Sequence, residues 1–147
     1  MTVKPIPDGY GTVTPYLMAR NSGAVIMFLE QAFDATVKTR VNAPDGRLLN
    51  AELQVGTSMI MIGQPPSEED ISSCSFYIYV EDADAVYAQA LAAGGSSIME
   101  PADMPYGDRH GGVSDPDGNS WWIATHIEDV SAEEVERRMK PILENGS

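Results

Sequence analysis

Two segments of the chain recur about sixty residues further on, and this repeat limits the possible folds more than any other feature. Asn21–Val25 (NSGAV) resembles Asp82–Val86 (DADAV), and Gly56–Met61 (GTSMIM) resembles Gly118–Ile123 (GNSWWI). The first pair is offset by 61 residues and the second by 62. Two matches at nearly the same offset indicate an internal duplication, so we expect two copies of one structural unit.

In the first half of the chain, the apolar pattern predicts strand, helix, strand, strand, strand. Ser22 can cap the helix, and Pro44-Asp45-Gly46 has the composition of a hairpin turn. The predicted strands cover residues 12–19, 35–43, 47–55 and 58–63, and the predicted helix covers 22–33.

The second half repeats this order after a polar linker at 64–73. Its helix begins at Asp82 or Asp84 and ends at Gly94-Gly95, and an irregular loop through Pro101, Pro105 and Gly107 is expected. The predicted strands are 74–81, 96–100, about 110–114 and 120–126.

A last helix is predicted at 131–143, because Ser131 and Glu134 form a capping-box pattern. Its apolar stripe of Val135, Met139 and Ile142 must cover something apolar, so we expect either a lid on the domain or a dimer contact.

Composition excludes several classes of partner. The formal net charge of −13 makes nucleic acid an unsuitable ligand, because phosphate binding requires clustered Lys and Arg. No apolar run approaches the roughly 20 residues of a membrane span, and the first residues lack a secretory leader pattern. The single cysteine, Cys74, is typical of a reducing cytoplasm, where we expect the protein.

Alternation along the strands predicts which side chains share a face. In 120–126, Trp121 should face the helices and Trp122 the opposite side, because successive strand residues point in opposite directions. In 74–81, Tyr77 and Tyr79 should share the face that carries Trp122.

Four motifs resemble the vicinal oxygen chelate superfamily, in particular its PhnB-like glyoxalase/bleomycin-resistance branch. They are Thr12–Leu17, Tyr106–Arg109, Asp115–Gly118 and Thr125–Asp129, within a resemblance that covers roughly residues 10–140. It implies one α+β domain of two βαβββ modules, with open, curled mixed sheets, helices outside and a C-terminal helix. Module one is then about 10–64, the linker 64–73, module two about 74–127, and the helix 131–143.

Metal-dependent members of this superfamily bind the metal through four symmetric positions. The repeat places those positions at Thr14, Ile60, Ser75 and Trp122, and these residues do not make a divalent-metal site. No cofactor is therefore predicted, although an atypical divalent-metal site that uses Glu52, His110 or His126 stays open as an alternative.

The resemblance also implies a ligand cup on the sheet faces opposite the helices. Its candidate ligand-binding residues are Tyr16, Gln54, Tyr77, Tyr79, His110 and Trp122, with Met18 and Ile62 beside them. Glu52 is either a general base with a pKa raised by burial or a surface carboxylate. His126 is either a base oriented by a carboxylate or a hydrogen-bonded residue at a strand end. Asp108 and Arg109 are expected to form a structural ion pair.

Three functions follow as hypotheses. The first is a binding protein for a small aromatic, preferably cationic, molecule. The second is a metal-independent or atypically metal-dependent lyase or isomerase of the lactoylglutathione-lyase type, with Glu52 or His126 as base. The third is an interaction role with the cup filled by side chains. In each case we expect a homodimer, because open sheets leave strand edges that need partners.

Overall fold

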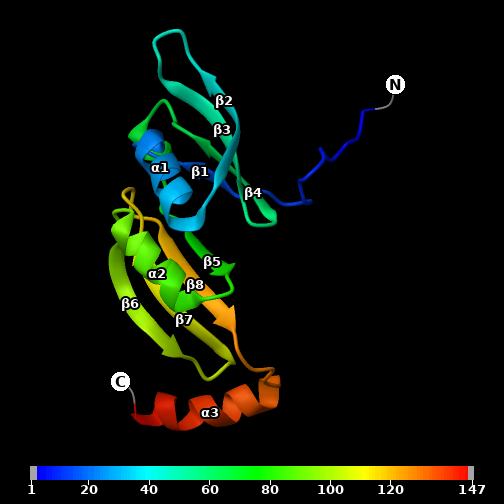
Figure 1. Ribbon diagram of the computed structural model, residues 1–147, viewed down its shortest axis with the longest axis vertical. Helices are drawn as coiled ribbons and strands as arrows, with labels where there is room; N and C mark the ends of the chain where they lie inside the picture. Colours follow the sequence, from blue (N-terminus) through cyan, green and yellow to red (C-terminus); the bar gives the residue numbers. More distant parts are fainter. Residues whose placement is uncertain (1–2, 146–147) are drawn as a thin grey trace.

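Each half of the chain forms a four-stranded mixed sheet with one helix on its face (Figure 1). This architecture comes from a computed structural model, which describes residues 3–145. The first module contains β1 (Tyr16–Met18), α1 (Ser22–Phe33), β2 (Thr36–Asn42), β3 (Leu48–Val55) and β4 (Ser58–Gly63), with strand order β1-β4-β3-β2. The α+β class and the two-module pattern predicted from the sequence are confirmed.

The second module repeats the first, and a linker with a short 3-10 helix, η1 (Glu68–Asp70), joins them. It contains β5 (Ser75–Tyr79), α2 (Ala83–Ala92), β6 (Ser96–Asp103), β7 (Asp108–Ser114) and β8 (Ser120–His126), with strand order β5-β8-β7-β6. The predicted C-terminal helix is α3 (Ala132–Asn145).

The two sheets share one register. Tyr16 of β1 lies opposite Met61 of β4, and Tyr77 of β5 lies opposite Trp122 of β8. Because both pairs are parallel and both members are 61 residues apart, Met61 is the counterpart of Trp122. Aligning Gly56 with Gly118 gives an offset of 62, which predicted Ile60 as that counterpart instead.

An apolar core lies between the sheets and the two helices α1 and α2, which pack against each other (Figure 1). An aromatic cluster joins the modules: the rings of Phe33 and Trp121 are 5.3 Å apart and those of Phe76 and Trp121 are 4.4 Å apart. Trp121 is fully buried, as the alternation predicted. Ile60 and Ile62 also point into this core, so their predicted places at the metal position and in the cup are wrong.

The turn before β8 is held by the buried carboxylate of Asp115. It accepts hydrogen bonds from the backbone amides of Asp117 and Asn119, the side-chain amide of Asn119 and the indole Nε1 of Trp121. Gly118 adopts a left-handed conformation there, with φ of 86°. The Asp-Pro-Asp-Gly-Asn sequence therefore fixes both the turn and the start of β8.

The largest differences between predicted and observed strand bounds are at β1 and β6. β1 covers only 16–18 rather than 12–19, because Pro15 has no amide hydrogen for a ladder, and most residues before it are exposed. β6 continues through Pro101 to Asp103, where a register shift between Met99 and Ala102 accommodates the proline. The expected irregular loop is thus reduced to a short turn at 104–107.

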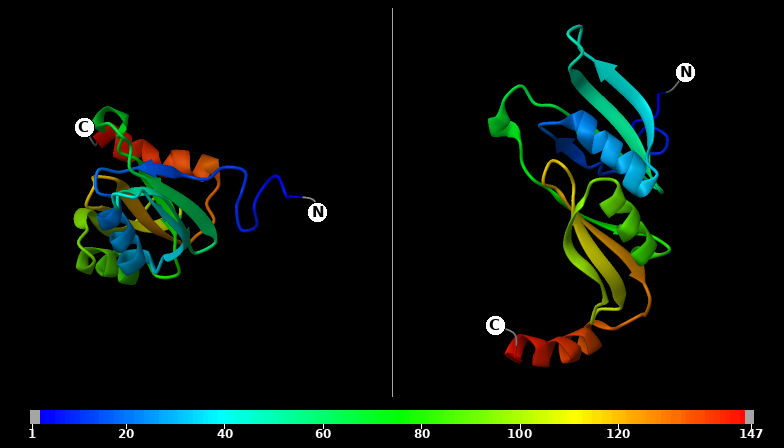
Figure 2. Two further views of the ribbon diagram at one scale, coloured as in Figure 1. Left: turned by 90° about the horizontal axis from the view of Figure 1, so that it is seen from above. Right: turned by 60° about the vertical axis from the view of Figure 1, so that its left-hand side comes forward.

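Both helices α1 and α2 lie on one side of the molecule, so the opposite faces of the two sheets are open (Figure 2). We call these the open faces. The helix α3 lies on their side, beyond the end of the second module (Figures 1 and 2). Within residues 3–145, no helix has the length and apolar composition needed to cross a membrane.

We predict that Trp121→Ala lowers the free energy of unfolding by about 3–5 kcal/mol, because it leaves a cavity between the modules and removes one of the two hydrogen bonds to Oδ2 of the buried Asp115. Trp122→Ala, on the open face, should cost roughly 1 kcal/mol. Urea unfolding of both variants measures this. The assignment of the two faces of β8 is wrong if the order of the two effects is reversed.

Candidate functional site

The open face of the second module carries a wall of aromatic side chains. Tyr77 and Tyr79 come from β5, His110 from β7 and Trp122 from β8. Tyr79 is 63% exposed, whereas His110 is buried behind the other rings. We call these four residues the aromatic wall. The structure therefore brings together four of the six ligand-binding residues that the sequence predicted.

A buried carboxylate, Asp108, lies at the end of this wall, where β7 begins. It is only 4% exposed, and its Oδ2 accepts hydrogen bonds from the hydroxyls of Tyr77 at 2.7 Å and Tyr79 at 3.0 Å. Its Oδ1 lies 2.8 Å from Nδ1 of His126. Three side chains from two strands thus converge on one anion.

The balance of interactions keeps Asp108 ionised. Burial raises the pKa of its carboxyl group, but the hydrogen bonds from Tyr77, His126 and Tyr79 outweigh burial and lower the pKa overall. Burial and the bond to Asp108 raise the pKa of Tyr77, and the bond to Asp108 is the main cause that raises the pKa of Tyr79. Both tyrosines therefore stay neutral, with their hydroxyl protons directed at the carboxylate.

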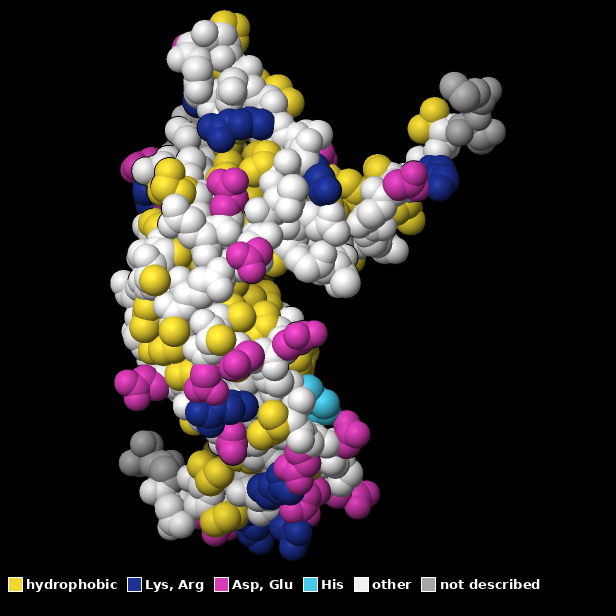
Figure 3. Space-filling view, in the orientation of Figure 1, with side chains coloured by type: hydrophobic (Ala, Val, Ile, Leu, Met, Phe, Trp, Pro, Cys, Tyr) yellow, Lys and Arg dark blue, Asp and Glu magenta, His cyan; other side chains and the backbone are white. Residues whose placement is uncertain are grey.

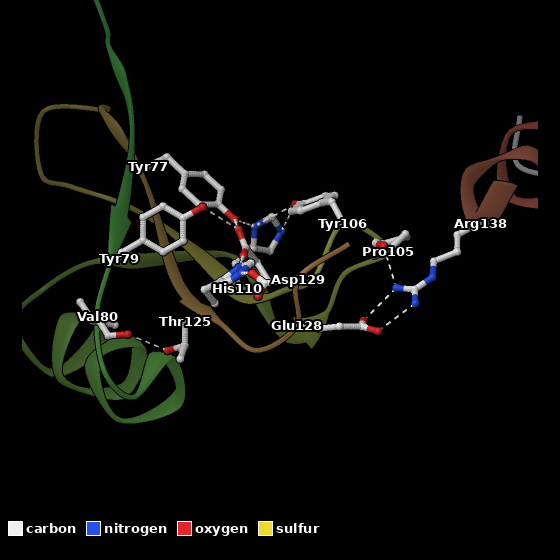
Figure 4. Close-up of polar contacts among 12 residues, drawn as sticks. Tyr77, Tyr79, Val80, Pro105, Tyr106, His110, Thr125, Glu128, Asp129 and Arg138 are labelled. Carbon is white, nitrogen blue, oxygen red and sulfur yellow. Dashed lines mark hydrogen bonds and ion pairs between the residues drawn. The ribbon is translucent and has the colours of Figure 1, made fainter. Parts of the chain in front are cut away.

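His110 lies at the centre of the wall and stays uncharged at neutral pH. Its Nδ1 is 3.2 Å from the hydroxyl of Tyr106 and 3.3 Å from that of Tyr77, and burial lowers the pKa of its imidazole (Figure 4). Its ring centroid is 5.4 Å from that of Trp122. Tyr106 belongs to the turn between β6 and β7.

Trp122 lies close against the sheet because its neighbour on β7 is a glycine. A Cβ atom on Gly112 would lie only 2.6 Å from Cζ3 of the indole. Any other residue at 112 would therefore push the indole away from the strand. The arrangement leaves the outer side of a large aromatic ring available to a ligand.

His126 joins the wall to the segment that follows β8. Its Nε2 is 2.7 Å from Asp129, and the hydrogen bonds to Asp129 and then Asp108 raise the pKa of the imidazole. The predicted carboxylate neighbour therefore exists, and the raised pKa increases the protonated fraction of His126, which leaves less of the free base.

The open face of the first module carries the remaining predicted site residues, Tyr16, Glu52 and Gln54. Thr39 donates a 2.6 Å hydrogen bond to Glu52, and the buried hydroxyl of Tyr10 lies near it without reaching hydrogen-bonding geometry. These hydroxyls lower the pKa of Glu52, so the expectation of a raised pKa is wrong.

The other two residues differ in their availability to a ligand. Gln54 uses its amide nitrogen on the carbonyl of Gly56, at 3.1 Å, whereas about half of the Tyr16 side chain is exposed.

Within one described chain, no hydrogen bond or aromatic contact joins these three residues to the aromatic wall. They lie on the first of the two sheets, which follow one another along the length of the chain (Figure 1). The single cup expected from the sequence is therefore present as two separate half-faces.

The expected ion pair of Asp108 with Arg109 is absent. Adjacent strand residues point to opposite faces, and Arg109 binds Asp84, at 2.7 and 3.0 Å, and Asp103, at 3.0 Å, on the helix side. Sequence reasoning therefore missed the role of Asp108. Its spacing of two residues from His110 was the available signal that both belong to one face.

The positions that hold a metal in some relatives do not fit one here. With Met61 in place of Ile60, the four residues are Thr14, Met61, Ser75 and Trp122, whose hydroxyls, thioether and indole are poor ligands for divalent cations. Among the described residues, no three or more His, Cys, Asp or Glu side chains gather in a metal-binding arrangement. Glu52 lies on one module, and His110 and His126 lie on the other.

A cavity of about 410 Å³ lies at the junction of the modules, along the outer edge of β5. Its lining is mainly apolar and includes Phe33, Ile60, Phe76 and Trp121 from the core side. It borders the backbone of Tyr77 and Tyr79, so it adjoins the aromatic wall without containing Asp108 or His110.

The sequence matches a known protein family and has relatives in mycobacteria. The family model of the Glyoxalase/Bleomycin resistance protein/Dioxygenase superfamily matches residues 13–123. An uncharacterised protein of Mycobacterium bovis is 28% identical over 138 residues, covering 86% of this chain and 91% of its own length.

Two solved structures show the same fold. TioX from Micromonospora sp. ML1 superposes with a TM-score of 0.67 and 22% identity, covering 80% of this chain and 100% of its own. The PhnB protein from Bacillus cereus has a TM-score of 0.65 and 19% identity, covering 78% of this chain and 99% of its own.

We predict that the two histidines titrate on opposite sides of the ordinary imidazole pKa of 6.5: His126 above it and His110 below it. Proton NMR of the ring resonances measures both values. Asp129→Asn should lower the pKa of His126 and leave that of His110 unchanged. A pKa of His126 below 6.5 would contradict the bridging arrangement.

The stability that His126 contributes should be fully present below its unfolded pKa of about 6.5 and lost as pH rises through its higher folded pKa. Asp108 has the opposite pH dependence, because its pKa is lowered in the folded protein. The stability that it contributes is present at neutral pH and is lost as pH falls through the folded pKa. The melting temperatures of the wild type and of His126→Gln, measured across pH, should therefore differ at acidic pH and become equal at alkaline pH.

Proposed function

Because this chain belongs to the glyoxalase/bleomycin resistance protein/dioxygenase superfamily, we propose that it is a binding protein that holds a planar, cationic small molecule against its aromatic wall. The observation that carries the proposal is the aromatic wall itself, which runs from the half-buried indole of Trp122 to Tyr77 and Tyr79 and ends at the ionised carboxylate of Asp108. A cation over an aromatic face gains roughly 0.5–2 kcal/mol, depending on how far it is desolvated. The neutral state of His110 leaves no positive charge at the centre of the wall.

The distribution of charge supports a cationic ligand. Between Cys74 and Ser131 the sequence has ten Asp or Glu residues and one Arg, whereas residues 10–63 have four of each sign. Acidic side chains accordingly gather over the lower half of the molecule in Figure 3. This field would draw cations toward the second module and would weaken as ionic strength rises.

The wall is also prepared for binding before a ligand arrives. Tyr77 and Tyr79 already direct their hydroxyls to Asp108, so their rings are held in place. A rigid aromatic surface loses little conformational entropy when a flat molecule stacks on it. Such a wall favours ring contact over hydrogen bonding to the tyrosine hydroxyls.

We also propose that the protein is a homodimer in which the first module of one copy covers the aromatic wall of the other. Within residues 3–145, no strand pairs with the outer edge of β1 or β5. In β5, Cys74 and Val80 direct their backbone groups to β8, so alternation leaves those of Tyr77 and Tyr79 facing outward. Pairing β1 of one copy with β5 of the other would provide hydrogen-bond partners for the outward-facing backbone groups of both edge strands.

Such a dimer would complete the cup. It would bring Tyr16, Glu52 and Gln54 of one copy opposite the aromatic wall of the other, where a single chain leaves the two groups apart. The neutral first module and the strongly acidic second module also repel each other less than two acidic modules would.

A second candidate is a lyase or isomerase. The observation in its favour is the pairing of His126 with the buried Asp108, at 2.8 Å, which orients an imidazole at the rim of the wall. In that case a substrate oxygen would take the place of Asp129 and accept a proton from Nε2 of His126, and Glu52 of the second copy would be the available base. Turnover of the methylglyoxal–glutathione adduct, with and without added Zn²⁺ or Ni²⁺, distinguishes this candidate from binding alone.

We predict that Trp122→Ala weakens binding of the planar cation proflavine by about 1–3 kcal/mol, because it removes the central ring of the wall. Fluorescence titration measures the affinity. Tyr87→Phe, on the helix side, is the matched control and should bind like the wild type. Equal binding of the anion 1-anilinonaphthalene-8-sulfonate would contradict the preference for cations.

We predict a solution mass of twice 15.9 kDa at micromolar concentration. Light scattering coupled to size-exclusion chromatography measures it. A monomer under these conditions would show that the cup is not completed by a second copy.

A further inference from the structure

The C-terminal helix α3 has an apolar stripe that its own chain covers only in part: Val135 and Met139 are half-buried, whereas the last turn is exposed. The stripe consists of Val135, Met139, Ile142 and Leu143, which share one side of the helix. Ile142 is 50% exposed and Leu143 is 70% exposed, and no residue of α3 is buried. An amphipathic helix normally gains its stability by burying such a stripe, so the C-terminal half of the stripe, Ile142 and Leu143, lacks a partner surface.

Polar contacts fix the position of α3 on the second module. Arg138 donates to the carbonyl of Pro105 at 3.0 Å and to both carboxylate oxygens of Glu128 at 2.9 Å (Figure 4). Glu134 binds Arg138 at 3.0 Å on the same side of the helix. These bonds set the direction of α3, which lies on the side of the open faces, and leave the outer part of its stripe uncovered (Figure 2).

The hairpin of β2 and β3, at the opposite end of the molecule, has complementary properties. Val41 and Leu49 are exposed apolar side chains, and Val41 pairs with Asn50 on the open face. Lys38, Arg40 and Arg47 lie on the same hairpin, and none of them has an ion-pair partner among the described residues.

We propose that α3 of one copy docks on the β2–β3 hairpin of a second copy. The two surfaces lie at opposite ends of one chain, so they cannot meet within it (Figure 1). The inference rests on the dimer proposed above, in which the first module of each copy covers the second module of the other. A two-fold axis then carries each hairpin to the end of the partner where α3 lies, and the contact forms twice.

Charge complementarity selects the hairpin as the surface on which α3 docks. The polar side of α3 carries Glu133, Glu136 and Glu144, which have no ion-pair partner among residues 3–145. The hairpin offers three unpaired cations and two exposed apolar side chains. A membrane surface fits α3 poorly, because four carboxylates against three cations on the helix would not attract anionic lipid.

The test reverses charge in the full-length protein and measures the dimer dissociation constant by analytical ultracentrifugation at low ionic strength. The α3 variant is Glu133→Lys, Glu136→Lys and Glu144→Lys, and the hairpin variant is Lys38→Glu, Arg40→Glu and Arg47→Glu. Each alone should weaken the dimer roughly tenfold or more, since several ion pairs are lost at two symmetric contacts. The combination of all six changes should restore most of the affinity.

A matched control separates docking from net charge. Glu68→Lys, Glu69→Lys and Asp70→Lys in the linker make the same change in charge as the α3 variant and should leave the dissociation constant unchanged. A second arm, Ile142→Ser with Leu143→Ser, removes exposed apolar groups. It should weaken the dimer by roughly tenfold without lowering the melting temperature of the monomer.

The outcomes separate this inference from the proposed function. A wild-type dimer with unchanged affinity in the α3 and hairpin variants would overturn the docking of α3 and leave the completed cup standing. A failure of the six-fold variant to restore affinity would also overturn it. A monomeric wild type would overturn the proposed dimer and this contact together, while proflavine binding to Trp122 would still report on the aromatic wall alone.

Discussion

The hydrogen bond from the indole of Trp121 to the carboxylate of Asp115 is the interaction on which the arrangement of the second module depends. It is 3.0 Å long and fully buried, and the same carboxylate holds the backbone of the turn through Asp117 and Asn119. A slip of β8 by one residue would therefore break the turn and expose the largest side chain of the core. With Trp121 fixed inward, Trp122 must face outward, and the aromatic wall follows from that register.

The same register explains why Asp108 can remain ionised in a buried position. Its partners Tyr77, Tyr79 and His126 come from β5 and β8, and only the present registers of β5 on β8 and of β8 on β7 align all three donors on one carboxylate. An unpaired buried carboxylate would be protonated or would destabilise the fold. The wall and the anion thus support each other, because the bonds that keep the charge also fix the rings.

Alternation along strands was sufficient to predict the two faces of β8 and the shared face of Tyr77 and Tyr79, since that pattern is local. It failed for Ile60 because matching the glycines ignored the different lengths of the two turns, which are two residues at 56–57 and five residues at 115–119. It was not applied to Asp108, whose neighbour Arg109 was taken as a partner. The separation of the two half-faces depends on how the modules pack, which no local pattern encodes.

The charge of the site argues against a simple transfer of glyoxalase chemistry to this chain. Where metal-dependent relatives place ligands, this chain has Thr14, Met61, Ser75 and Trp122, none of which carries a charge, and the aromatic wall ends at the anionic Asp108. The glutathione adduct of methylglyoxal carries carboxylates, which an ionised Asp108 and the acidic second module would repel. A flat cation meets the opposite field and a ready aromatic surface. The electrostatics of the wall therefore favour binding of a cation over turnover of an anionic thioester precursor.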